Sequence, residues 1–280
     1  MGPWSRAWAR YRRNRLAFIS LWVVVVIALV AIFAPVLAPY HHSTTNYGQT
    51  LAGIGTPGHP LGTDVLGRDI LSRMIFGFRT ALMVAVVAEI ISVVAALLIG
   101  VTAGYRGGKI ESLLMAITDV MYAFPGYLFA VLLVTVFGRS FWAVMAAIAV
   151  AGWVTQARLM RAQVMTIKKR EFVEAAKGMG AKGPTIATRY ILPNALGPLL
   201  VTTSFAVPAA ITTEAGLSLL GLGIANMPSW GAMINEGVRY ATSMPHMVLS
   251  PALAFAVTLL AFTWIGDGVR DAFDVTQEEG

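Results

Sequence analysis

The stretch LAFISLWVVVVIALVAIFAPVLA, residues 16–38, decides the fold class of this chain. It runs for 23 residues without a charged side chain. A helix rises about 1.5 Å per residue, and about 20 apolar residues cross the roughly 30 Å hydrocarbon core of a bilayer. The stretch therefore predicts a transmembrane helix.

Four arginines lie in residues 10–15, so this helix also has the charge pattern of a secretory signal peptide. Its apolar run is longer than the roughly 7–15 residues of a signal-peptide core. Cleavage after Ala38 would also leave Pro39 at the new N-terminus, which makes a poor cleavage site. We therefore expect an uncleaved membrane anchor.

The composition of the whole chain points to the same class. Of its 280 residues, 57% are apolar and only 12% are charged, against about 25% charged residues in ordinary soluble domains. The mean hydropathy is +0.70, which excludes intrinsic disorder. The chain has no cysteine, which excludes a disulfide framework and a thiolate metal site. An integral membrane protein remains.

Six apolar segments predict an all-α integral membrane protein with six transmembrane helices. Long unbroken runs favour helices over a β-barrel, whose strands alternate in polarity over about 10 residues. The fifth segment contains three prolines, so we expect it to be kinked or partly unwound. The segments are residues 16–38, 80–104, 113–137, 140–157, 191–213 and 247–266.

The distribution of Lys and Arg predicts the orientation of these helices. With the N-terminus in the cytoplasm, five of the 21 Lys and Arg residues lie outside and the rest lie inside. We expect both termini to be cytoplasmic, with tails 1–15 and 267–280 flanking one transmembrane domain, 16–266. Topology and anionic lipid thus explain the pI near 9.9, and nucleic acid is not an expected partner. The five outer residues are Arg68, Arg73, Arg79, Arg139 and Arg239.

The loop at residues 168–190, KKREFVEAAKGMGAKGPTIATRY, is the longest cytoplasmic connection. Its apolar side chains recur at helical spacing, glycines then end the helix, and Pro184 can begin another. Periodicity leaves two roles open, a helix on the lipid surface or a helix that enters a groove on a partner. The apolar stripe consists of Phe172, Ala175, Ala176 and Met179.

The spacing of this loop resembles the EAA loop of ABC importer permeases. Three further strings match the same group: HPLGTDVLGRDILSRMIFGFRTAL from residue 59, EAGLSLLGLGIANMPSWGAMINEG from residue 214, and GDGVRDAFD from residue 266. Over residues 12–274 the chain resembles the second-type permease subunits of dipeptide, oligopeptide and nickel ABC importers. The loop match consists of Glu174, Ala175 and Ala176, then Gly178, then Ile191, Leu192 and Pro193.

The resemblance implies a type I ABC importer fold in the prokaryotic inner membrane. It implies a heterodimer with a second permease subunit, two cytoplasmic ATPase subunits and an extracytoplasmic substrate-binding protein. Peptide is the expected cargo, with nickel chelates and oligosaccharides as alternatives. The loop would be the coupling helix that docks on an ATPase subunit. The expected coupling residues are Phe172, Glu174, Ala175, Ala176, Gly178, Met179 and Pro193.

We expect no enzymatic activity and no cofactor on this chain, with ATP and Mg bound by the partner ATPase subunits. The sequence agrees, because it has no G-x-x-x-x-G-K-[ST] phosphate loop. It also lacks the H-E-x-x-H and G-x-S-x-G strings that an intramembrane enzyme would carry. A self-sufficient secondary transporter would show an internal repeat and mid-membrane carboxylates, and we find no repeat.

Small and charged residues alternate in the first outer loop. Its aspartates can pair with Arg68 or Arg73 and so fix the loop's shape. We therefore prefer a structural or gating role for this motif over direct contact with substrate. The histidines of this loop lack the spaced carboxylates or thiolates of a metal site, and no metal is expected. The motif consists of Gly62, Asp64, Gly67, Arg68 and Asp69.

Two acidic residues lie within the apolar segments, Glu89 and Asp119. A charge at the bilayer centre costs about 2.5–3.5 kcal/mol, so such residues usually face protein or water. For Glu89 we prefer a hydrogen bond to a neighbouring helix over a place in the substrate pathway. Asp119 is expected near the inner interface, where water can solvate it. Gly100 and Gly104 form a G-x-x-x-G pattern that allows close helix packing.

Overall fold

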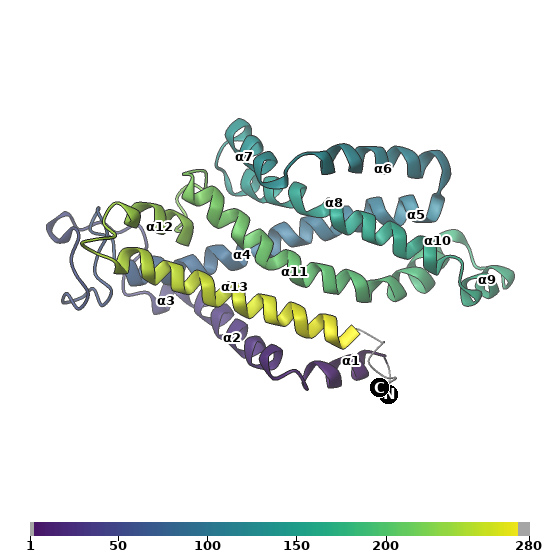
Figure 1. Ribbon diagram of the computed structural model, residues 1–280, viewed down its shortest axis with the longest axis horizontal. Coiled ribbons are helices and arrows are strands. Elements are labelled where there is room, and N and C mark those ends of the chain that lie inside the picture. The colour runs from purple at the N-terminus through teal and green to yellow at the C-terminus, as the bar shows by residue number, and fades with distance from the viewer. Residues whose placement is uncertain (1–2, 274–280) are drawn as a thin grey trace.

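The computed structural model describes residues 3–273, and most of them are helical (Figure 1). Extended pairing within that range is limited to two isolated bridges, Thr56 with His59 and Thr63 with Asp69. Among the described residues, five helices are long and apolar enough to cross a membrane, and there are up to six if one bent pair counts as a span. The prediction of an all-α protein with several membrane spans is confirmed. Residues 1–2 and 274–280 of the expected tails lie outside the described residues.

Residues 3–137 form the N-terminal half of the bundle. They are α1 (Pro3–Tyr11), α2 (Arg15–Ile32), α3 (Ala34–Leu37), the 3₁₀ turn η1 (Tyr47–Gln49), α4 (Ile70–Ala96), the π-helical segment η2 (Leu97–Val101), α5 (Thr102–Arg106), α6 (Gly108–Ala123) and α7 (Gly126–Phe137).

The C-terminal half begins with the helix that leads into the cytoplasmic loop. It contains α8 (Phe141–Ile167), α9 (Glu171–Gly178), α10 (Gly183–Thr185), the π-helical segment η3 (Ile186–Ile191), α11 (Leu192–Leu219), α12 (Trp230–Val238) and α13 (His246–Phe273).

The long helices extend well beyond the segments expected from hydropathy. Residues Ile70–Arg106 and Gly183–Leu219 each form 37 residues of continuous helix. At about 1.5 Å per residue this is about 55 Å, longer than the roughly 30 Å hydrocarbon core. Each of these helices is therefore longer than one crossing of the hydrocarbon core requires, and the bundle has two distinct ends. One end carries α9, α10, α1 and the end of α13, and the other carries α3 and α12 (Figure 1). We call these the α9 end and the α12 end.

The segment expected as one span at residues 113–137 is not a single straight helix. Helices α6 and α7 meet at an angle of 89°. The break falls at Phe124, whose backbone is extended at φ −84 and ψ 134. The cause is Pro125, because the ring of a proline disfavours helical geometry in the residue before it.

For the proline-rich fifth segment, the structure corrects only the expected unwinding. Helix α11 continues through Pro198 and Pro208 without unwinding, and Pro193 lies in its first turn. A proline is well tolerated there, because its missing N–H has no helical partner in any case. The irregular turn lies just before these prolines, in η3.

The core lies where α4, α8 and α11 pack together. Val84, Met145 and Leu217, one from each helix, are fully buried in it. A Cβ atom on Gly100 would lie 2.5 Å from the Ala157 carbonyl oxygen on α8, so a glycine permits this close approach. Outside the core, α2 packs on α13 and leaves apolar side chains on its outer face, as expected toward lipid.

Candidate functional sites

Helix α9 forms the tip of the bundle at the α9 end (Figure 1). Its C-terminus is closed by a Schellman motif: the Ala181 N–H donates to the Ala176 carbonyl at 3.0 Å, and the Gly180 N–H donates to the Lys177 carbonyl at 2.9 Å. Gly180 has a φ of 84°, which a glycine adopts without strain. The chain then turns sharply, and Pro184 opens α10.

The apolar stripe predicted for α9 divides between two faces. Ala176 has no exposed surface and, together with Val173, faces the rest of the chain. Phe172 is 44% exposed and Met179 is 78% exposed. Ala176 therefore does not belong to the outward stripe, and its small size serves packing within this chain. Phe172, Ala175 and Met179 remain as an outward apolar face.

The other expected coupling residues lie on the surface around this face. Glu174 is exposed, and its carboxylate has no hydrogen-bond or ion-pair partner within residues 3–273. A Cβ atom on Gly178 would have no neighbour within 4 Å. Pro193 is exposed at the start of α11. These positions are open to a partner.

A groove of about 780 Å³ lies directly beside α9. Phe172 contributes one wall, and Asn194 at the start of α11 contributes another. The rest of its lining comes from the end of α8 and the residues that follow it. Phe172 belongs both to this groove and to the outward face of α9, and we call the two together the docking surface.

This surface is fixed to the long helix formed by α4, η2 and α5. The Lys168 ammonium donates a hydrogen bond to the Tyr105 carbonyl and lies 5.3 Å from the centroid of the Tyr105 ring. A Cβ atom on Gly183 would lie 3.2 Å from the Tyr105 hydroxyl, so α10 also packs on this residue. The residues on both sides of α9 therefore contact α5.

At the α12 end, the outer-loop motif forms a compact knot before α4. Asp64 is 1% exposed and accepts hydrogen bonds from the backbone of Leu66 at 2.8 Å and from the backbone of Arg68 at 3.0 Å. It also accepts from the Arg68 Nε at 2.7 Å and from Arg73. Asp69 instead caps α4, accepting from the Ser72 N–H at 2.7 Å.

Two glycines of this motif are required by the backbone. Gly62 and Gly67 have φ values of 77° and 71°. A Cβ atom on Gly62 would lie 2.2 Å from the Ala52 carbonyl oxygen, and one on Gly67 would lie 1.9 Å from the Asn46 carbonyl oxygen. All five motif residues therefore shape the loop at the start of α4.

The ion-pair cluster continues to α12 through a residue that the sequence did not single out. Glu236 accepts from Arg68 at 2.9 Å and from the two terminal nitrogens of Arg73 at 2.6 and 3.1 Å. Arg73 is 4% exposed. Glu236 is 163 positions from Arg73, so no local sequence pattern connects the two. The one sequence signal for Glu236 was its place in the matching string that begins at residue 214.

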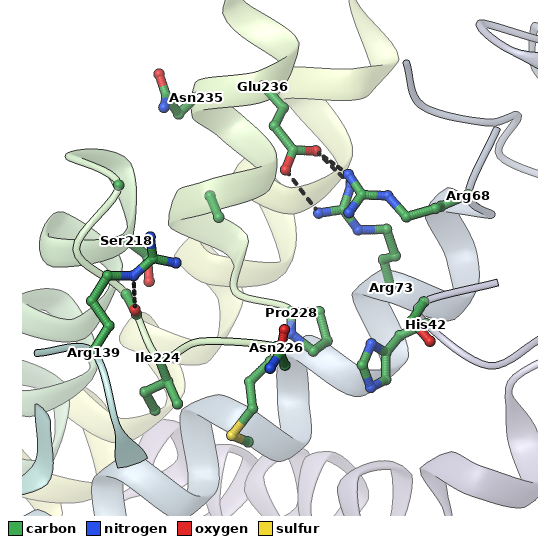
Figure 2. A pocket seen from close by; sticks show the side chains of 15 residues that line it. His42, Arg68, Arg73, Arg139, Ser218, Ile224, Asn226, Pro228, Asn235 and Glu236 are labelled. Carbon is green, nitrogen blue, oxygen red and sulfur yellow. Dashed lines mark hydrogen bonds and ion pairs between the residues drawn. The ribbon is translucent and has the colours of Figure 1, made fainter. Parts of the chain in front are cut away.

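A cavity of about 390 Å³ lies beside this cluster (Figure 2). Arg139 lies on the opposite side of the cavity from Glu236, and its Nε donates to the Gly223 carbonyl at 3.1 Å. Burial lowers the pKa of His42 in the cavity wall, and His41, Arg73 and Arg68 nearby lower it further. The lining of the cavity contains three arginines and one carboxylate, that of Glu236.

The two intramembrane carboxylates join α8 to different helices. Glu89 on α4 is 6% exposed and accepts a hydrogen bond from the Gln156 amide on α8. Asp119 on α6 forms an ion pair with Arg158 on α8 at 2.6 Å, although its side chain is 64% exposed. Among residues 3–273, no group of His, Asp or Glu side chains is placed to hold a metal ion.

The chain has long apolar helices, an exposed helix at one end and a polar cavity at the other. These features define a multi-pass membrane component. Residues 96–276 match the family described as binding-protein-dependent transport system inner membrane component, and residues 2–53 match the N-terminal TM domain of oligopeptide transport permease C. The chain belongs to this inner-membrane transport family.

Three similar curated proteins cover nearly the whole chain. The oligopeptide transport system permease protein OppC of Bacillus subtilis is 38% identical over 275 residues, covering 97% of this chain and 89% of that protein. OppC of Escherichia coli K12 is 40% identical, covering 97% and 90%. The dipeptide transport system permease protein DppC of Bacillus subtilis is 39% identical, covering 96% and 84%.

A solved structure shares the fold. It is an inward-facing conformation of the MetNI methionine ABC transporter, matched with a TM-score of 0.56 and 18% sequence identity. The match covers 71% of this chain and 96% of that chain. The expected ABC-importer permease fold is thereby confirmed.

Proposed function

We propose that this chain is a transmembrane permease subunit of an ABC importer and forms half of a pathway for di- and oligopeptides. The curated relatives, named as oligopeptide and dipeptide permeases, support the peptide cargo. The observation that carries the proposal is the docking surface at the α9 end. Within residues 3–273 its outward side chains have no partner, and a turn of three residues joins its helix to the end of α8.

In this proposal the α9 end faces the cytoplasm and docks on an ATPase subunit. A second permease subunit completes the pathway, and a binding protein delivers the peptide at the α12 end. The excess of Lys and Arg in the segments around α9 supports this orientation. ATP and Mg bind on the ATPase subunits, and this chain binds no cofactor of its own.

The packing suggests how ATP-driven movement reaches the pathway. Helix α9 lies between α8 and α11, and Lys168 ties the same region to α5. A shift of α9 with its ATPase subunit therefore tilts three long helices together. Because these helices are longer than one crossing of the hydrocarbon core requires, a small tilt at the α9 end is carried across the membrane to the α12 end.

The test is uptake of radiolabelled trialanine into proteoliposomes that hold the complete importer and its binding protein. We expect uptake to need ATP and to stop when the ATPase subunits carry a substitution that blocks hydrolysis. Uptake by this chain without the ATPase subunits would instead indicate a secondary transporter. ATP-driven uptake of a nickel chelate or an oligosaccharide, but not of trialanine, would refute the peptide cargo.

A further inference from the structure

The cavity at the α12 end is enclosed enough to hold part of a small ligand. Its volume of about 390 Å³ falls within the roughly 300–1,000 Å³ range of ligand pockets. The ends of α4 and α11, helix α12 and the α7–α8 connection all contribute to its walls (Figure 2). The proposed function places this cavity outside the cell, where cargo arrives.

The positive charges around the cavity differ in how far they are neutralised. Arg68 and Arg73 are paired with Asp64 and Glu236. Glu236 is in turn engaged by both arginines, and it is the carboxylate that lines the cavity. Arg139 has no carboxylate partner among residues 3–273, and its terminal nitrogens have no hydrogen-bond acceptor there.

Arg139 is nevertheless held in a fixed position. Its Nε donates to the Gly223 carbonyl at 3.1 Å, and its own carbonyl accepts from the Ala225 N–H at 2.9 Å. These two bonds fix the residue against the loop that follows α11, while both terminal nitrogens stay available. A guanidinium held in this way can offer two parallel donors to a carboxylate without a large loss of side-chain entropy.

Two side-chain amides add uncommitted donors to the same cavity. Asn226 and Asn235 line it, and neither side chain has a hydrogen-bond partner in the described part of the chain. Figure 2 shows Asn226 beside Pro228, lower in the view than the Arg68–Glu236 pair. The available groups are thus one charged fork and two amides, a set that matches an anionic, hydrogen-bond-accepting group.

We propose that this cavity is a subsite for the C-terminal carboxylate of the arriving peptide, with Arg139 as its charged donor. This inference rests on the proposed function. Every linear peptide ends in a carboxylate whatever its sequence, so a contact with that group accepts many peptides. A carboxylate on the binding protein is the competing source, and the test separates the two.

The test measures peptide binding without the binding protein. Trialanine and trialanine amide are dialysed to equilibrium against the assembled permease–ATPase complex in nanodiscs. We expect Arg139→Gln to raise the Kd for trialanine at least about tenfold, because a hydrogen bond to a charged group is lost. The amide should bind weakly to wild type and variant alike. Arg139→Lys keeps the charge but not the two parallel donors, so its Kd for trialanine should lie between those of wild type and Arg139→Gln.

Arg239→Gln is the matched control, because Arg239 is exposed near the same end but does not line the cavity. We expect it to leave the trialanine Kd unchanged. Co-purification of the ATPase subunits with each variant shows that the complex still assembles, so that a loss of binding is not a loss of folding.

Three results would overturn the inference. Equal binding of trialanine and its amide by wild type would show that the carboxylate is not recognised. An unchanged trialanine Kd in Arg139→Gln, with a loss of ATPase stimulation by the binding protein, would assign the cavity to an acidic side chain of that protein. If wild type shows no ATP-driven trialanine uptake at all, the proposed function falls and the subsite with it.

Discussion

Replacing Phe172 with alanine should weaken the docking of the ATPase subunit without unfolding this chain. A phenylalanine side chain buries about 200 Å² when fully covered, and 44% of Phe172 is exposed. A partner can therefore cover about 90 Å² more. At about 25 cal/mol per Å² this contributes about 2 kcal/mol, or about thirtyfold in affinity.

Biolayer interferometry of ATPase subunits on nanodisc-held permease would measure this change. Leu66→Ala is the matched control, because Leu66 is 40% exposed and its N–H donates to Asp64 in the motif at the α12 end. We expect the control to bind the ATPase subunits as wild type does. A Phe172→Ala affinity within twofold of wild type would refute the reasoning, since the outward face of α9 would then contribute nothing to docking.

Two further substitutions test the packing that supports both ends. Gly100→Leu should lower the thermal unfolding temperature by several degrees, because its Cβ would lie 2.5 Å from the Ala157 carbonyl oxygen and α8 must move; an unchanged melting curve in detergent would contradict the close packing. Arg73→Met should destabilise the chain by about 3 kcal/mol, because it leaves the buried Asp64 with one cation fewer. Denaturant unfolding measures this, and Glu236→Gln, at a side chain 31% exposed, should cost clearly less.

Much of the fold could be predicted because hydropathy is a local property. The apolar run at residues 16–38 can be recognised as a membrane span by counting its residues, and α2 occupies most of it. The Gly180 turn and the Pro184 start after α9 follow from backbone preferences of single residues. The motif around Asp64 could also be interpreted as structural, because its glycines and charges lie within one short segment.

The remaining features depend on contacts between distant segments. The bend at Phe124 interrupts an apolar run that hydropathy treats as continuous, and only the geometry before a proline reveals it. The pairing of Glu236 with Arg73 joins positions far apart in the chain. The burial of Ala176 depends on the packing of α9 against η3. The sequence does not reveal it, because an apolar stripe on a helix can face either a partner or the core of the same chain.

Uptake by a Gly178→Trp variant tests most directly whether α9 couples this chain to ATP hydrolysis. A side chain at Gly178 has open space in this chain, with no neighbour within 4 Å of its Cβ and no positive φ. Gly53→Trp is the matched control, because Gly53 is equally open but lies beside Gly62 of the outer-loop motif at the opposite end. We expect the Gly178 variant to insert and fold normally yet lose ATP-driven trialanine uptake, while the control keeps it. Full uptake by the Gly178 variant would contradict coupling through α9.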